Sequence, residues 1–259
     1  MSGSGTTNVP TDRIMVYAAS KEFRDNEVAL VGTGLPMIAA YVAKRTHAPN
    51  LVLVFESGVV DAEPRHIATG VGDFPLVPHA VQIDTLFQTL SLLQRGRIDL
   101  GFLGGAEIDQ HGNINSTVIG PYAAPKVRLP GSGGANDIAS LANRVVIIAK
   151  HQRRKFPLQV HYITTPGYLD GPGARERNGL KGKGPQKVIT DLGVFRFDPA
   201  TLCMQLLTLH PGVTLESVEE NTQFPIKPGS SSIPETEVPP RDIVELIDDL
   251  DRDHVYLKD

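Results

Sequence analysis

EVALVGTGLPMIAAYVAKRTHAPNLVLVFESG, residues 27–58, contains the pattern that decides the fold. A short apolar run ends in glycines at residues 32–34, a helix-like segment follows at 35–49, and a second apolar run at 51–55 ends on Glu56. Apolar runs without alternation are typical of strands covered on both faces. The segment between them has helical length and stops before Pro49. We therefore predict two parallel strands joined by a helix.

The same alternation of strands and helices continues through the first 110 residues. We expect a helix at 13–26 with Asp12 as its N-cap, a helix at 84–95 with Gly96 as its C-cap, and a strand with a following loop at 98–109. Later strands are predicted at 145–150, 160–165, 188–197 and 204–212, before an acidic helix at 242–251. The predicted fold class is α/β: an open, mostly parallel sheet with helices on both faces and a strand-rich second half.

Length and composition favour a single unit. The chain has 259 residues and 28.0 kDa, with 41% hydrophobic residues, no fixed-period repeat and no long linker. We expect one α/β domain over residues 1–259. Within it, residues 1–11 are expected to form a flexible N-terminus, and residues 226–242 a surface excursion before the last helix.

Charge, hydropathy and cysteine content narrow the function classes. The formal net charge of −4 gives no reason to expect nucleic acid as a partner. No uninterrupted apolar window approaches 18 residues, and the polar start has no apolar signal region, so neither a membrane span nor a secretory signal is expected. The single cysteine, Cys203, allows no intrachain disulfide and fits a reducing cytoplasm.

Several familiar catalytic motifs are missing. GTGLPM (32–37) lacks the third glycine of a dinucleotide fingerprint, and the glycine-rich stretch 171–184 lacks P-loop spacing. The sequence contains neither G-x-S-x-G nor H-E-x-x-H, and no two of its eight histidines are four residues apart. Dinucleotide binding, P-loop, serine hydrolase and metal chemistry are therefore not the first choices, and no metal site is expected.

What remains is a set of small-residue loops at predicted strand ends. They are GTGLP (32–36), ESG (56–58) and GGAEIDQHGNINST (104–117), joined by GSGGAND (131–137) before a predicted helix. Open α/β sheets bind ligands outside the carboxyl ends of their strands. Glycines expose backbone amides there, and the start of a helix adds a positive dipole end. Amide donors around Glu56 suit acyl chemistry, with a carboxylate nucleophile and an oxyanion hole.

The residues alone leave ordinary alternatives open. A glutamate just after a strand is commonly a solvated loop residue, and Gly104, Gly105, Gly133 and Gly134 could simply form tight turns. The basic run at 150–155 could be a solvated face. The loop at 171–186 could contact a phosphate-bearing ligand through its arginines Arg175 and Arg177 or its lysines, or could be a flexible exposed loop.

The order of these motifs carries a family resemblance. Between about residues 12 and 226 the chain contains, in sequence, VGTGLPMIAAYVAKRTHAPN, ESGVVDAEP, GVGDFP, GFLGGAEIDQHGNINSTVIG, LPGSGGANDIAS, HQRRKF, TTPGYLDGPGARERNGL, VITDLGVFRFD and LHPGVTLESVEENTQF. These stretches resemble the β subunit of glutaconate CoA-transferase, a class I CoA-transferase. ESG followed by GGAEID and GSGGA is far more specific than any single glycine motif. The last thirty residues contribute little to the resemblance.

The resemblance implies a role for each loop. Glu56 corresponds to the family nucleophile, which attacks an acyl-CoA thioester and passes through a mixed anhydride to a glutamyl–CoA thioester in ping-pong catalysis. The implied oxyanion and CoA-binding residues are Gly133, Gly134 and Ala135 with Gly104, Gly105 and Ala106. The implied site-lining residues are Gly32, Gly34, Ser57 and Gly58.

The resemblance also implies partners. The family site lies where α and β subunits meet, so we expect a separate α subunit, and αβ pairs that assemble further. The expected ligands are an acyl-CoA and a carboxylic acid, glutaconate or a related acid; no cofactor is expected to be bound permanently, since the coenzyme A thioester is itself a substrate. His79 and Arg65 could meet a second carboxylate.

Two other functions stay open on the same scaffold. Some relatives resemble acyl-CoA decarboxylases or ring-opening C–C hydrolases, and these depart from the family pattern at the glutamate, which is present here. A more remote alternative is a ligand-sensing module without catalysis, but no helix-turn-helix precedes residue 12.

Overall fold

The protein is described by a computed structural model that covers residues 9–64 and 66–257. Its helices are α1 (Thr11–Ser20), α2 (Leu35–Arg45), α3 (Leu86–Gln94), α4 (Ala135–Leu141), α5 (Ala174–Arg177), α6 (Leu215–Glu220) and α7 (Arg241–Leu250), with short 3₁₀ turns η1 (Phe74–Leu76) and η2 (Arg153–Lys155). The strands are β1 (Val28–Leu30), β2 (Val52–Val54), β3 (Val59–Val60), β4 (Gln82–Ile83), β5 (Leu100–Leu103), β6 (Glu107–Ile108), β7 (Ile114–Asn115), β8 (Val118–Ile119), β9 (Val127–Arg128), β10 (Arg144–Ala149), β11 (Pro185–Thr190), β12 (Gly193–Phe197), β13 (Met204–Leu209) and β14 (Lys227–Pro228).

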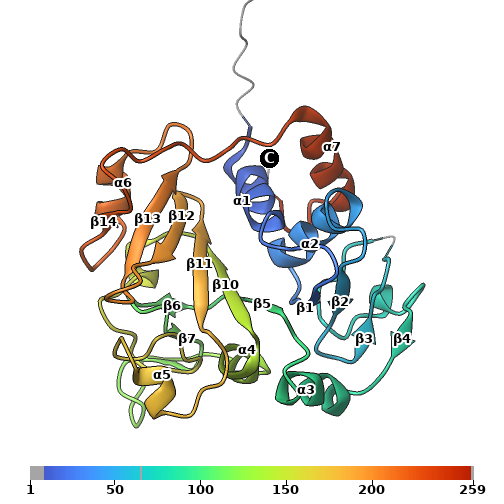
Figure 1. The fold of residues 1–259 in the computed structure, drawn as a ribbon, viewed down its shortest axis with the longest axis horizontal. Helices are drawn as coiled ribbons and strands as arrows, with labels where there is room; N and C mark the ends of the chain where they lie inside the picture. Colours follow the sequence, from blue (N-terminus) through green and yellow to red (C-terminus); the bar gives the residue numbers. More distant parts are fainter. Residues whose placement is uncertain (1–8, 65, 258–259) are drawn as a thin grey trace, which may run out of the picture.

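One large sheet organises the fold. Its strand order is β14-β13-β12-β11-β10-β5-β1-β2-β3-β4, and β6–β7 and β8–β9 form two small ribbons beside it. The five central strands, from β11 to β2, pair in parallel, whereas β3, β4 and β12 are added antiparallel toward the edges. The predicted α/β class with an open, mostly parallel sheet is confirmed (Figure 1).

Helices cover both faces of this sheet. α1, α2 and α7 pack together on one face, and α3 and α4 lie on the other (Figure 1). Neighbouring residues of one strand therefore enter different cores: Ala29 and Leu53 belong to the cluster under α1 and α2, and Leu30 and Val54 to the cluster on the opposite face. Burial on both faces explains why the apolar runs of the sequence do not alternate.

The predicted helices at 35–49, 84–95 and 242–251 are confirmed as α2, α3 and α7, while the expectation of Asp12 as an N-cap is wrong. Pro10 occupies the N-cap position of α1, and Asp12 lies in its first turn, where its carboxylate pairs with Lys150. The helix also ends earlier than predicted, at Ser20. Pro10 is extended (φ −56°, ψ 141°), and its carbonyl accepts the first hydrogen bonds of the helix, from the Arg13 N–H at 3.0 Å and the Ile14 N–H at 3.4 Å.

Two strand predictions are also corrected. Residues 188–197 are divided between β11 and β12, which form a hairpin that turns at Asp191. Residues 160–165 form no strand; they contribute only an isolated bridge between Thr165 and Ile114. The place that this β-branched run would take in the sheet is filled, because β10 pairs directly with β11.

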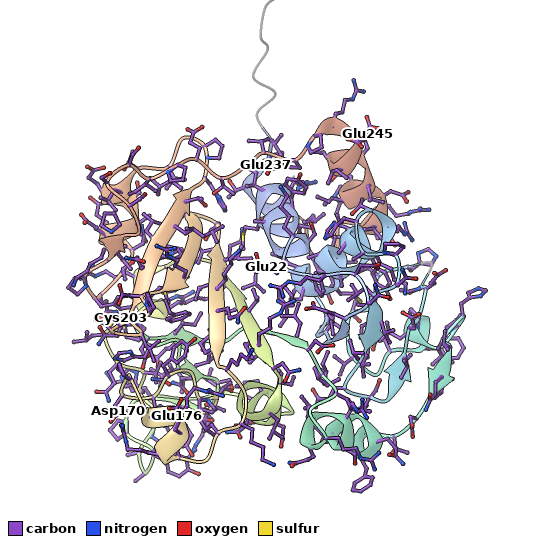
Figure 2. The ribbon with its side chains drawn as sticks, viewed as in Figure 1. Glu22, Asp170, Glu176, Cys203, Glu237 and Glu245 are labelled. Carbon is purple, nitrogen blue, oxygen red and sulfur yellow. The ribbon has the colours of Figure 1, made fainter. Side chains whose placement is uncertain are left out.

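The segment 226–242 runs along the surface and is fixed at several points. β14 adds to the sheet beside β13, and Thr236 is buried against His210 and Thr208. Glu237 lies over α1, where Tyr17 Oη donates to its carboxylate at 3.0 Å (Figure 2). Of the expected flexible N-terminus, residues 1–8 lie outside the described residues.

The turn after β2 depends on a glycine. Gly58 has φ +104°, and its carbonyl accepts a hydrogen bond from the Asp84 N–H at 2.8 Å. A Cβ atom at position 58 would lie 2.2 Å from the Asp84 carbonyl oxygen. The connection from β4 to α3 is therefore in direct contact with this turn, and a side chain at position 58 would force the two segments apart.

A buried polar network joins β11 to its neighbours. The two ring nitrogens of His151 lie 3.2 Å from Thr190 Oγ1 and 2.9 Å from Thr222 Oγ1. His210 Nε2 donates to the Thr190 carbonyl at 2.7 Å, and its Nδ1 lies 2.9 Å from Thr236 Oγ1. Burial lowers the pKa of His151 to about 4 and also lowers the pKa of His210. Both rings are therefore neutral at pH 7.

This burial predicts acid sensitivity. Between pH 6.5 and about 4 the unfolded chain binds a proton at His151 that the folded chain does not, so the free energy of unfolding should fall across that window. The loss should reach about 3 kcal/mol at the lower end. Urea denaturation at pH 7, 6, 5 and 4.5 measures it. His151→Gln should lose less stability than the wild type over this range, and equal losses would contradict the assignment.

Gly58→Ala should destabilise the fold by about 2–4 kcal/mol, because the new methyl group overlaps the Asp84 carbonyl at a backbone angle that favours glycine. Gly32→Ala is the matched control, since no heavy atom lies within 4 Å of a Cβ built there. Urea denaturation of both variants at one pH makes the comparison. Similar stabilities of the two variants would show that the close contact between Gly58 and Asp84 does not constrain the fold.

Candidate active site

Glu56 lies in the tight turn that links β2 to β3. The Phe55 N–H donates to the Val59 carbonyl and the Gly58 N–H to the Phe55 carbonyl, both at 2.9 Å. Phe55 is fully buried, whereas Glu56 is partly exposed. Ser57 Oγ donates to the Val71 carbonyl at 2.6 Å. Three hydrogen bonds thus hold the turn, and the Glu56 carboxylate lies beyond the carboxyl end of β2.

The GSGGA loop meets this carboxylate. The Gly134 N–H donates to Glu56 Oε1 at 3.1 Å, across a separation of 78 residues. A Cβ at position 134 would lie 3.0 Å from Glu56 Cδ, so a side chain there would require the carboxylate to shift. Gly133 is also close, since its Cβ position lies 3.7 Å from Oε1. The Ala135 N–H instead donates to the Ser132 carbonyl at 3.0 Å, inside the turn that begins α4.

The loop at 104–117 supports the GSGGA loop at 131–135. Ser116 and Gly131 are joined by two hydrogen bonds of 2.8 Å. The Gly131 N–H donates to the Ser116 carbonyl, and Ser116 Oγ donates to the Gly131 carbonyl. Asn136 Nδ2 donates to the Thr164 carbonyl at 2.8 Å. These contacts place the start of α4 against the 114–117 segment and the 164–165 segment, so the GSGGA loop has its own anchor.

Gly105 and Ala106 take part in packing. A Cβ at position 105 would lie 2.1 Å from Ile114 Cγ2, and the Ala106 N–H donates to the Asn115 carbonyl at 2.9 Å. The amide of Ala106 is therefore engaged within the β6–β7 ribbon. Gly104 borders a separate cavity of 250 Å³ whose wall is formed by Met15, Thr33, Leu35, Pro36, Gly104, Ile148, Ala149 and Lys150.

The strand register places the loops after β1, β2 and β5 on one edge of the sheet. Leu30 pairs with Val54 on one side and Gly101 on the other, and Gly101 pairs with Val145. The chain therefore leaves β1, β2, β5 and β10 at the same carboxyl edge. Gly32 and Gly34 follow β1 there, one strand away from Glu56; Gly34 has φ +89° and forms the N-cap of α2.

Two buried carboxylates stabilise the loops around the site. Glu107 accepts from Asn115 Nδ2 and lies 2.7 Å from His161 Nδ1. Asp109 accepts hydrogen bonds from the amides of His111 and Asn113, and burial raises its pKa. The hydrogen-bond partners of both carboxylates lie in the loop at 104–117 or beside it, so Glu107 and Asp109 stabilise the structure of this loop. In the part of the chain that is described, no group of three potential ligands lies close enough to hold a metal ion.

Other sequence hypotheses do not converge on Glu56. Arg175 is buried and donates to the carbonyls of Ala139, Gly167 and Gly182, so it does not face a phosphate-bearing ligand. His79 lies in the wall of a separate 460 Å³ cavity, and Arg65 lies outside the described residues.

Sequence reasoning missed several supporting residues. Val71 and Asp84 hold the Glu56 turn, and Ser116 and Thr164 hold the GSGGA loop. Ser116 belongs to the small-residue loop at 104–117, but nothing in its residue type indicates that its partner is Gly131. These contacts join segments that only the tertiary fold brings together.

Comparison with known proteins gives the family. Residues 13–221 match the family model described as Coenzyme A transferase. The chain is 40% identical to the β subunit of glutaconate CoA-transferase from Acidaminococcus fermentans over 247 residues, which cover 93% of this chain and 92% of that protein. It is 43% identical to the β subunit of 3-oxoadipate CoA-transferase from Pseudomonas knackmussii over 221 residues, 84% of each chain.

Solved structures agree in fold. The crystal structure of glutaconate coenzyme A-transferase from Acidaminococcus fermentans matches with a TM-score of 0.91 and 38% identity, over 98% of this chain and 99% of that chain. The decarboxylase AibA/AibB matches with a TM-score of 0.83 and 25% identity, over 96% and 97%. No helix in the described residues is long and apolar enough to cross a membrane. The family model and the two transferase relatives each cover most of the chain, so this chain belongs to the coenzyme A transferase family, as a β subunit.

Proposed function

We propose that this β subunit, together with an α subunit, transfers CoA from an acyl-CoA to a carboxylic acid through a covalent intermediate on Glu56. The observation that carries the proposal is the 3.1 Å hydrogen bond from the Gly134 N–H to Glu56 Oε1. A weakly nucleophilic carboxylate gains from fixed orientation, which is worth about 7–11 kcal/mol in favourable cases. The bond on Oε1 orients the group and leaves Oε2 to attack.

The first half of the reaction follows from this geometry. Oε2 attacks the thioester carbonyl, the C–S bond breaks, and the CoA thiolate leaves, which gives a mixed anhydride with Glu56. The thiolate then attacks Glu56 Cδ and generates an oxyanion on Oε1. The Gly134 N–H already points at that oxygen, and one such donor is worth roughly 2.7–4 kcal/mol. Collapse releases the first acid and leaves a glutamyl–CoA thioester.

The second half reverses these steps with another acid. The incoming carboxylate attacks Glu56 Cδ and displaces the thiolate, and the thiolate then attacks the acyl carbonyl and regenerates the Glu56 carboxylate. No proton is consumed, because a carboxylate enters and a carboxylate leaves. CoA is thus carried by substrates and by Glu56, and the proposal includes no permanently bound cofactor.

The proposed site contains three groups of residues. Glu56 is the nucleophile and Gly134 the oxyanion donor, with Gly133 beside it. Ala135, Gly104, Gly105 and Ala106 shape the oxyanion and CoA-binding loops, and Gly32, Gly34, Ser57 and Gly58 line the neighbouring strand ends.

We propose one domain over 1–259, a cytoplasmic location that suits a single cysteine, and αβ pairs that assemble further.

A dicarboxylate is the proposed acid. The two transferase relatives act, by name, on glutaconate and on 3-oxoadipate, and both acids carry two carboxyl groups. The same fold also belongs to the decarboxylase AibA/AibB, which makes decarboxylation of an acyl-CoA the second candidate. The carboxylate at position 56, which the Gly134 amide holds, favours transfer, since decarboxylation requires no acyl acceptor on the enzyme.

Glu56→Ala should abolish CoA transfer, and Glu56→Asp should lower it by about 100-fold, because shortening the side chain withdraws the carboxylate from Gly134. Wild-type αβ complex incubated with glutaryl-CoA or glutaconyl-CoA alone should form a hydroxylamine-sensitive adduct on Glu56, seen by mass spectrometry. Size-exclusion chromatography checks that both variants still bind the α subunit. Full transfer by Glu56→Ala, or CO₂ release with Glu56 unmodified, would overturn the proposal.

Gly134→Ala should lower kcat by about 100- to 1000-fold, because the added methyl group displaces Glu56 from the amide that stabilises its oxyanion. Gly72→Ala is the control: no heavy atom lies within 4 Å of its Cβ position. Steady-state transfer rates of the two complexes, at matched α-subunit saturation, give the comparison. A Gly134→Ala complex as active as Gly72→Ala would rule out this donor.

A further inference from the structure

A cavity on the α3 face of the sheet plays no part in the proposed transfer. It has a volume of 370 Å³, and neither Glu56 nor Gly134 lies in its wall. Its floor is built from apolar side chains of β1, β2, β3 and α3, namely Val28, Val52, Val54, Val60 and Leu92. A largely apolar cavity with a few polar groups at its rim is the usual form of a small-molecule site. This cavity is therefore a candidate for a ligand of its own.

The cavity is present because α3 covers these strands only partly. α3 has nine residues, of which Thr89 and Leu93 are buried. Val28, Val52 and Val60 pack at the margin of the core on this face and stay half-buried. Removing apolar surface from water is favourable, and the gain grows with the area removed. A ligand with an apolar body would therefore gain free energy by covering these valines.

Arg95 and Arg97 give the rim an excess of positive charge. Both line the cavity, and in the described part of the chain neither side chain has a hydrogen-bond or ion-pair partner. Asp84 is the one acid in the wall, and its carboxylate already accepts hydrogen bonds from Gln82 Nε2 and from the Thr85 N–H, both at 2.9 Å. Guanidinium groups bind carboxylates through paired, charge-assisted hydrogen bonds. The rim therefore favours an organic acid over a neutral or cationic ligand.

The charged groups of two other cavities already have partners within the chain. In the 460 Å³ cavity, two acids match two arginines, and Asp249 pairs with Arg252 at 2.6 Å. In the 250 Å³ cavity, Lys150 pairs with Asp12. Of these three cavities, the one beside α3 combines unpaired arginines with an apolar floor.

The wall of this cavity also supports the Glu56 turn. The Asp84 N–H donates to the Gly58 carbonyl at 2.8 Å, and Thr89 Oγ1 lies 3.5 Å from the Phe55 carbonyl oxygen. Asp84 and Thr89 both line the cavity, while Phe55 and Gly58 stand on either side of Glu56 in the sequence. A ligand that binds the folded wall stabilises it against local opening, and the turn that rests on this wall is stabilised with it.

We propose that this cavity binds a small carboxylic acid with an apolar chain, and that the bound acid protects the Glu56 turn from local opening. The carboxylate pairs with Arg95 and Arg97, and the chain lies over the valine floor. The cavity is separate from Glu56, so the acid acts there as an effector and not as the acyl acceptor. This inference does not depend on the transfer chemistry proposed for Glu56.

Octanoate is the probe, and isothermal titration calorimetry of the αβ complex measures its binding. The wild-type complex should bind octanoate saturably. Butyrate should bind at least about tenfold more weakly, because its shorter chain covers less of the apolar floor. 1-Octanol should also bind at least about tenfold more weakly, since it has no carboxylate to pair with the arginines.

Substitutions at the rim test the assignment of the arginines. Arg95→Gln and Arg97→Gln should each lower the affinity for octanoate at least about fivefold. Lys126→Gln is the matched control, because Lys126 is an exposed cation outside the wall of the cavity, and its affinity should stay within about twofold of the wild type. Circular dichroism confirms that the three variants fold. Glu56→Ala should bind octanoate as the wild type does, so failure of the chemistry and failure of this site are distinguishable.

Hydrogen exchange followed by mass spectrometry tests the effect on the turn. At saturating octanoate, the amides of residues 55–60 and 84–89 should exchange at least about threefold more slowly in the wild-type complex, whereas those of α6 should not change. Both arginine variants should show less protection at the same octanoate concentration. No saturable binding, equal affinity in both arginine variants and the wild type, equal affinity for 1-octanol, or binding that Glu56→Ala abolishes would overturn the site. Unchanged exchange at 55–60 under saturation would overturn the protection of the turn.

Discussion

Parallel pairing of four adjacent strands is the constraint on which the site depends. β2, β1, β5 and β10 run in the same direction, and their register places their carboxyl ends at one level. The loops after β1 and β5, the Glu56 turn and the segment that begins with Lys150 all leave the sheet there. A slip of one residue in any pair would turn that strand's side chains to the opposite core. The packed cores on both faces of the sheet therefore keep the loops in place.

Close backbone contacts then set the position of Glu56. Gly58 passes so near the Asp84 backbone that position 58 has no room for a Cβ, and at position 134 a Cβ would lie only 3.0 Å from Glu56 Cδ, so that the carboxylate would have to shift. At both points the close contact is also the site of a hydrogen bond, at 2.8 Å and 3.1 Å. The carboxylate is thus oriented by main-chain atoms, whose positions depend on the fold more than on side-chain rotamers. This arrangement suits the nucleophilic role that we propose for Glu56.

The sequence predicted the elements whose signals are local. Continuous apolar runs indicated the central strands, and the spacing at 35–49 and 84–95 indicated α2 and α3. It failed where tertiary structure decides: the run at 160–165 has strand propensity but no free place beside β10. The strand-end rule grouped Glu56 with the GSGGA loop, and the motif order of a known family gave the pair its expected roles. The anchors of that pair, such as Asp84 and Thr164, have residue types that fit any loop, so no pattern could identify them.

The position of the last helix has a consequence for how the chain is made. α7 packs on α1 and α2, and Arg13 donates to Asp248 at 2.9 Å across 235 residues. During synthesis, α1 and α2 emerge well before α7 and lack their covering helix until residues 241–250 have left the ribosome. On the opposite face, α3 and α4 are followed within a few residues by β5 and β10, and that core then takes in residues as late as Ile226. The layer of α1, α2 and α7 therefore depends on contacts between segments far apart in the sequence, which form late in folding.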